Sequence, residues 1–182
     1  MKKIFVVTLV LLLVACNQSI YREYHTDYPY YQTFEDMMDK ADSIFEGEVL
    51  TSAAYSIDLN AGDDFMKPLH DNEQPANDDF VYTVYEINVL TVYKGELDIN
   101  ARIKIKVLGG VVGNDVYTDL KSVRFEDGNK FMFLTVSFTN ELMPWSLINP
   151  EQGYYQIIDD LYIKNTQNSV EIDMGLLTTN ES

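Results

Sequence analysis

The stretch that decides the fold runs from Phe80 to Leu108 and reads FVYTVYEINVLTVYKGELDINARIKIKVL. Its first half, residues 80–93, is dense in β-branched and aromatic residues and holds neither Pro nor Gly, which predicts one long strand. Gly95 can adopt the positive φ of a tight turn directly after it. The stretch therefore predicts two strands joined through a turn at Lys94-Gly95.

The second strand is predicted by strict alternation. Between residues 102 and 108, apolar side chains of one parity face one way and basic side chains of the other parity face the opposite way, as in a half-buried strand. The two sets are Ile103, Ile105 and Val107 against Arg102, Lys104 and Lys106. In the first strand the alternation changes phase, because Leu90 and Val92 take up the parity opposite to Tyr85, Ile87 and Val89. Such a change predicts a β-bulge or a barrel corner.

The remaining pattern predicts one short helix and further sheet. Thr33 is a suitable N-cap for a helix whose apolar face holds Phe34, Met37, Met38 and Ala41. Strands are predicted over residues 43–55, 116–125, 130–138 and 145–148, and a strand or hairpin over 154–164 around Asp159-Asp160. Gly47, inside the first of these strands, indicates a bulge or a close backbone approach. We therefore predict a single all-β domain over residues 33–164, followed by a polar, poorly ordered tail over 165–182.

Composition excludes several classes of function. The formal net charge of −16 argues against nucleic-acid binding, since phosphates need Lys and Arg opposite them. An acidic protein favours a basic protein or a cationic ligand as its partner. With a single Cys, the chain can form no intrachain disulfide and no zinc site built from four cysteines or from two cysteines and two histidines.

The N-terminus predicts export. Lys2 and Lys3 precede an apolar run, Ile4 to Val14, that is too short to span a bilayer, so residues 1–15 read as a signal peptide. The run ends in Leu13-Val14-Ala15-Cys16, which resembles the lipobox of bacterial lipoproteins. This resemblance implies cleavage before Cys16, lipidation of its thiol, and a membrane anchor on the extracytoplasmic face of the cell envelope. An ordinary secretory signal with an incidental Cys is the alternative.

Residues 16–32 then read as a polar tether with five tyrosines, at positions 21, 24, 28, 30 and 31. The simpler interpretation is a spacer that lifts the domain off the membrane, with some Tyr packed back on the barrel. The alternative is an aromatic patch that contacts glycans or lipid headgroups.

The segment from Ile57 to Asp79 is rich in Asp, Asn, Gly and Pro, and a loop of this length is either functional or disordered. Its beginning resembles an EF-hand loop, with calcium ligand candidates Asp58, Asn60, Asp63 and Asp64. The match fails where Asp63 replaces the required Gly and Leu69 replaces the bidentate Glu. We therefore expect a solvated acidic loop without a metal cofactor, with calcium as the alternative.

Catalytic patterns are not found in the sequence. His25 lies in the tether and His70 in the acidic segment, so neither is placed to serve as the base of a nucleophile. With 29 acidic residues, a pair of carboxylates could still meet in space, which leaves a carboxylate-dependent hydrolase as an alternative. Trp145 is expected to pack over a barrel end rather than to form a ligand platform. We predict a protein that is not an enzyme.

Three segments together resemble netrin-like and metalloproteinase-inhibitor domains, and similar segments occur in small uncharacterised bacterial lipoproteins. They are ADSIFEGEV at residues 41–49, VYKG at 92–95 and GNKFMFL at 128–134. The resemblance implies a mostly antiparallel, closed or partly open barrel of OB-like type. It does not imply protease inhibition, since those inhibitors chelate zinc through a free N-terminal Cys that disulfides hold in place. The sequence thus predicts a lipid-anchored, non-catalytic binding module, with a calcium-responsive or structural envelope lipoprotein as an alternative.

Overall fold

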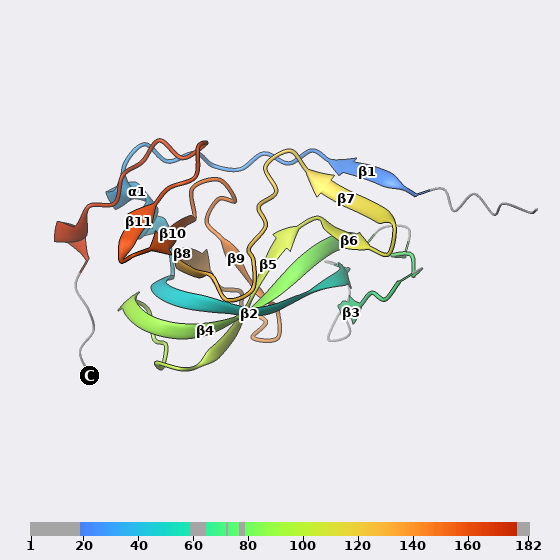
Figure 1. Ribbon diagram of the computed structural model, residues 1–182, viewed down its shortest axis with the longest axis horizontal. Helices are drawn as coiled ribbons and strands as arrows, with labels where there is room; N and C mark the ends of the chain where they lie inside the picture. The colour runs from blue at the N-terminus through green and yellow to red at the C-terminus, as the bar shows by residue number, and fades with distance from the viewer. Residues whose placement is uncertain (1–18, 59–64, 72, 77–78, 178–182) are drawn as a thin grey trace, which may run out of the picture.

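The computed structural model describes residues 19–58, 65–71, 73–76 and 79–177. Figure 1 shows β1, β6 and β7 gathered at one end of the molecule and α1, β10 and β11 at the other. The elements are β1 (Tyr21–Tyr24), α1 (Phe34–Lys40), β2 (Ser43–Ile57), β3 (Met66–Pro68), β4 (Phe80–Lys94), β5 (Arg102–Leu108), β6 (Gly110–Val112), β7 (Asp115–Asp119), β8 (Lys130–Val136), β9 (Trp145–Leu147), β10 (Tyr154–Ile158), β11 (Leu161–Ile163) and a 3₁₀ turn, η1 (Met174–Leu176).

Five strands close into a ring in the order β2, β4, β5, β9, β8 and back to β2. All of these pairings are antiparallel except that of β5 with β9, which is parallel. Strands β10, β11 and β3 extend the same sheet, and β1, β7 and β6 form a separate sheet of three strands. The predicted all-β, mostly antiparallel, OB-like barrel with one short N-terminal helix is confirmed.

The stretch from Phe80 to Leu108 forms β4, a turn and β5, as its pattern predicts. Gly95 has a φ of +95° directly after β4. Opposite β4, Glu46 of β2 pairs with Thr91 while Gly47 pairs with Val89, so Leu90 is an extra residue on β4. The predicted phase change is therefore a bulge, and it lets two 15-residue strands curl around the core.

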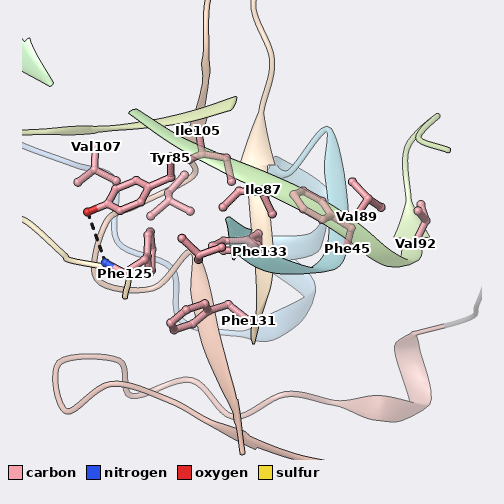
Figure 2. Close-up of a cluster of buried hydrophobic side chains, with 12 residues drawn as sticks. Phe45, Tyr85, Ile87, Val89, Val92, Ile105, Val107, Phe125, Phe131 and Phe133 are labelled. Carbon is pink, nitrogen blue, oxygen red and sulfur yellow. Dashed lines mark hydrogen bonds between the residues drawn. The ribbon is translucent and has the colours of Figure 1, made fainter. Parts of the chain in front are cut away.

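The inner faces of the ring bury a core of aromatic and branched side chains, shown in Figure 2. Ile87 and Ile105 come from β4 and β5, Phe45 from β2, and Phe133 from β8. The Phe45 and Phe133 rings lie 5.6 Å apart between centroids, across the pairing that closes the barrel. The predicted apolar parity of β5 therefore faces inward.

A second core lies outside the ring, where α1 packs against β8 and β10. Thr33 caps the helix, because its hydroxyl accepts from the Asp36 N–H at 3.1 Å while its own N–H donates to the Asp36 carboxylate at 3.2 Å. Met37 is fully buried in this cluster, which confirms its role as core filler.

The two ends of the domain differ from expectation in the same way. Residues 19–32, expected as a spacer with some Tyr packed back on the barrel, do pack on the domain through Tyr24 and Tyr31. The backbone is held as well, because β1 pairs in parallel with β7 and the Tyr31 backbone exchanges two hydrogen bonds of 2.9 Å with the Gln152 side-chain amide. Val170, in the expected tail, is buried in the second core and accepts a hydrogen bond from the Tyr155 hydroxyl at 3.1 Å. Both segments are polar overall, so their average composition does not reveal the few residues that attach them to the domain.

The acidic segment is also partly structured. Its residues 66–68 form β3, which pairs with the end of β2, and the flanking Phe65 and Leu69 are buried. Leu69 packs with Val81, Val112 and Tyr117 in a third cluster. Two apolar side chains therefore fix part of a segment that its charge predicts to be solvated.

Gly47 gives a test of barrel closure. A Cβ at this position would overlap the buried Ile87 side chain and lie 3.1 Å from the Asn88 carbonyl oxygen. We expect Gly47→Ala to lower the free energy of unfolding by about 1–3 kcal/mol, as overpacking of a core does. Urea denaturation measures the effect. Gly128→Asn is the control, because Asn tolerates a positive φ and a Cβ there meets nothing within 4 Å; equal losses in both variants would contradict the prediction.

Candidate ligand site at the barrel mouth

Phe125 closes one mouth of the barrel. It lies in the connection between β7 and β8, is buried, and points into the aromatic core (Figure 2). Its ring centroid is 4.9–5.4 Å from the rings of Tyr85, Phe131, Phe133 and Tyr154, all in edge-to-face geometry. Such aromatic pairs contribute beyond the area that they bury. The connection is therefore anchored at Phe125 and positions the residues on either side of it.

A cavity of about 440 Å³, here called the mouth cavity, opens beside this connection. Ser52, Ala53 and Ala54 of β2 form part of its wall, and small side chains there leave room that larger ones would fill. The other lining residues are Thr83 and Tyr85 of β4, Val111 of β6, and Arg124, Phe125 and Glu126. Barrel mouths are a common place for ligand sites, and polar groups on a partly apolar wall are typical of such sites.

Arg124 and Glu126 flank Phe125 and are exposed. Both line the mouth cavity, and both also line a second cavity of about 290 Å³ on the side of β8, β10 and β11. Neither takes part in any ion pair of the described residues. The connection thus presents one positive and one negative group to both cavities, and neither group forms an ion pair with another described residue.

The phenols near the site stay neutral. Burial raises the pKa of Tyr85, whose hydroxyl oxygen accepts the Phe125 N–H at 3.4 Å. Burial likewise raises the pKa of Tyr154, which lines the second cavity. At neutral pH both hydroxyls are protonated and can act as hydrogen-bond donors or acceptors, so Arg124 and Glu126 are the charged residues that line the mouth cavity.

Lys106 is a second chemically unusual residue, on the outside of the barrel. The alternation of β5 places it on the outer face as predicted, but its side chain is only 6 % exposed. Its Nζ donates to the Pro144 carbonyl at 2.8 Å and lies 3.7 Å from the centroid of the Phe138 ring. Burial lowers its pKa to about 7. The connection between β8 and β9 therefore covers a lysine that the period-two pattern predicts to be solvated.

Glu46 is the centre of a third polar cluster. One of its carboxylate oxygens accepts from the hydroxyls of Tyr93 at 2.6 Å and Tyr162 at 2.5 Å, and the other accepts from Thr91 at 3.2 Å. Burial and the hydrogen bond to Glu46 raise the pKa of Tyr93. The cluster ties β11 to β2 and β4, and every hydrogen bond named here is internal, so its role is structural.

None of the site candidates singled out from the sequence that the structure describes lines the mouth cavity. Cys16, Asn60, Asp63 and Asp64 lie outside the described residues. Asp58 directly follows β2, and its backbone N–H donates to the Phe65 carbonyl at 2.9 Å. Within the described ranges, no three His, Cys, Asp or Glu side chains gather as a metal site. His25 lies 4.0 Å from Glu23, His70 is exposed, and Trp145 packs half-buried against the barrel core.

Arg124 and Glu126 were missed by sequence reasoning. Arg124 falls at the end of the stretch predicted as a strand, residues 116–125, and Glu126 begins the turn predicted after it, but the strand there, β7, ends at Asp119 and the chain continues as an irregular connection. A signal does exist, since Arg124-Phe125-Glu126 sets one large aromatic residue between two opposite charges. Only the tertiary fold shows that the aromatic residue enters the barrel.

Comparison with protein-family models, with curated proteins and with solved structures found no match. The resemblance to netrin-like domains therefore stays a prediction from the three short segments of sequence. In the part of the chain that the structure describes, no helix is long and apolar enough to cross a membrane.

The burial of Lys106 predicts a pH-dependent stability. Its pKa is about 7 in the folded protein against an ordinary 10.5, so between these values the unfolded chain binds more protons and stability rises with pH. Relative to a Lys106→Met variant, we expect the wild type to gain up to about 2 kcal/mol in unfolding free energy between pH 7 and pH 9.

Urea denaturation at pH 7, 8 and 9 measures this difference. Lys104→Met is the matched control, because Lys104 lies two residues earlier on β5 and is exposed. Its difference from the wild type should not change with pH. A pH-independent difference for Lys106→Met as well would mean that Lys106 stays charged across this range, held by Pro144 and Phe138.

Proposed function

We propose that this protein is a lipid-anchored, non-catalytic binding module on the extracytoplasmic face of the bacterial cell envelope, and that the mouth cavity holds its ligand. The Leu13-Val14-Ala15-Cys16 motif behind a short apolar run supports the anchor. The OB-like barrel supports a binding role, because loops around such barrels serve as ligand sites on many unrelated proteins.

The observation that carries the proposal is the mouth cavity with Arg124 and Glu126 at its rim. Arginine suits a carboxylate, which it can bind through two parallel hydrogen bonds, while Glu126 suits an ammonium group. Ser52 and Thr83 add hydroxyls to the wall, and the Thr83 hydroxyl already donates to the Gly109 carbonyl at 2.8 Å. The ligand class that matches this arrangement is a small zwitterion, such as an amino acid or a short peptide.

The overall charge supports the same class. The net charge of −16 becomes −18 when the two positive charges of Lys2 and Lys3 leave with the signal peptide. A field of this sign repels purely anionic ligands and attracts those with a cationic group. A non-catalytic role is favoured because the lining residues described for this cavity offer binding groups but include neither His nor Cys.

The anchor is tested by the state of Cys16. We expect the protein made in bacterial cells to partition with membranes and its N-terminal peptide to show diacylglyceryl and acyl groups by mass spectrometry. Two or more acyl chains bind membranes durably, since each buried CH₂ contributes about 0.8 kcal/mol. Cys16→Ser should release the protein from the membrane fraction. An unmodified Cys16 thiol in the wild type would rule out the anchor.

The ligand class is tested by thermal unfolding in the presence of free amino acids and di- and tripeptides. A ligand present at about 100 times its Kd should stabilise the fold by about 2.7 kcal/mol. We expect Arg124→Gln and Glu126→Gln each to weaken this stabilisation. Arg102→Gln is the control, because Arg102 pairs with Glu86 on the outside of the barrel at 2.9 Å. A panel without effect, or a shift that survives both rim substitutions, would count against the site.

A further inference from the structure

An exposed apolar row crosses the sheet formed by β1, β7 and β6. Tyr21 pairs with Val116, and Val116 pairs with Val111, so the three side chains stand side by side on one face. This set is called the apolar row below. Tyr21 is 67 % and Val111 42 % exposed, while Val116 between them is half-buried. Leu120, directly after β7, is 77 % exposed.

The opposite face of this sheet is already occupied. Tyr117 and Val112 belong to the third cluster, together with Leu69 and Val81. Asp115, two residues before Tyr117 on β7, is also buried. The outward face is the exposed one, and Val111 on it also lines the mouth cavity. Contiguous exposed apolar patches mark interaction sites with proteins or membranes, so the rest of this face is open to an occupant from outside the described chain.

The position of Cys16 indicates that occupant. The start of β1 is fixed to the domain, because the Ile20 N–H donates to the Asp115 carboxylate at 2.7 Å and the Ile20 carbonyl accepts from the Val116 N–H at 2.8 Å. Cys16 precedes Ile20 by four residues, which reach at most about 14 Å when fully extended. The polar headgroup layer of a bilayer takes up about 5–8 Å of that distance.

We propose that the apolar row lies against the lipid bilayer, with Tyr21 at headgroup level. The inference rests on the lipid anchor of the proposed function, since lipid on Cys16 brings this face to the membrane. A tyrosine ring suits that depth because its body is apolar and its hydroxyl remains hydrated. The row is also the one nearest the anchor, whereas the next pairing along the strands, Glu23 with Thr118, is polar.

A second exposed apolar group gives a matched control. Ile158, Leu161 and Ile163 lie on the hairpin of β10 and β11, at the end of the molecule away from β1 (Figure 1). Leu161 is 63 % exposed, close to the value for Tyr21. Hydrophobicity alone would direct both groups to the bilayer equally, whereas the short link at Cys16 favours the β1 end.

The test uses the chain from Cys16 onward, which retains every described residue and has one thiol. Cys16 is coupled to a maleimide-headgroup phospholipid in phosphatidylcholine vesicles that contain brominated acyl chains, which quench tryptophan at short range. Trp145→Phe removes the natural fluorophore, and Tyr21→Trp, Val111→Trp or Leu161→Trp then adds one reporter at a time. Because coupling is chemical, the result does not depend on whether the cell acylates Cys16, which mass spectrometry of the cellular protein decides separately.

We expect Tyr21→Trp and Val111→Trp to be quenched several-fold more than Leu161→Trp, and Tyr21→Asp to abolish the quenching seen at position 111. Circular dichroism of each variant confirms that it is folded before vesicles are added. Equal quenching at all three positions, or quenching at position 161 alone, would overturn the proposal. So would three unquenched reporters on folded, coupled protein, which would mean that the domain stands away from the membrane.

Discussion

The structure depends on β2 pairing along both of its edges. Over residues 44–48 the strand is bonded to β4 on one side and to β8 on the other, so this short length of backbone closes the ring. Closure requires the strands to bend sharply, and the extra Leu90 on β4 and the missing side chain at Gly47 both serve that bend. The closed ring packs on both of its faces. The aromatic core fills its inside, and α1 and the second core pack against its outside.

The elements that sequence predicted well are those whose information is local. Alternation in β5, the phase change before Val92 and the turn at Gly95 each follow from a few neighbouring residues, and the structure has all three. The parallel pairing of β5 with β9 could not be predicted in this way, because it joins Ile105 to Trp145 across forty residues and involves only two residue pairs. Pairings of this kind are decided by tertiary packing.

In the candidate site, even more depends on tertiary packing and less on neighbouring residues in the sequence. Arg124 and Glu126 acquire their position from Phe125, and Phe125 acquires its position from four rings on β4, β8 and β10. Lys106 likewise sits on the predicted face, but Phe138 and Pro144, more than thirty residues later, bury it. Period-two patterns state which way a side chain points, whereas the connections between strands decide what covers it.

The parallel pairing of β1 with β7 also has a mechanical consequence. A pull on residue 19 that is directed along β1 loads the four register pairs from Tyr21 to Tyr24 together in shear. A strand pulled at right angles to its axis would instead lose its hydrogen bonds one after another, as a zipper opens. Thermal motion or flow that pulls on residue 19 in this direction is therefore resisted by all four register pairs of β1 at the same time.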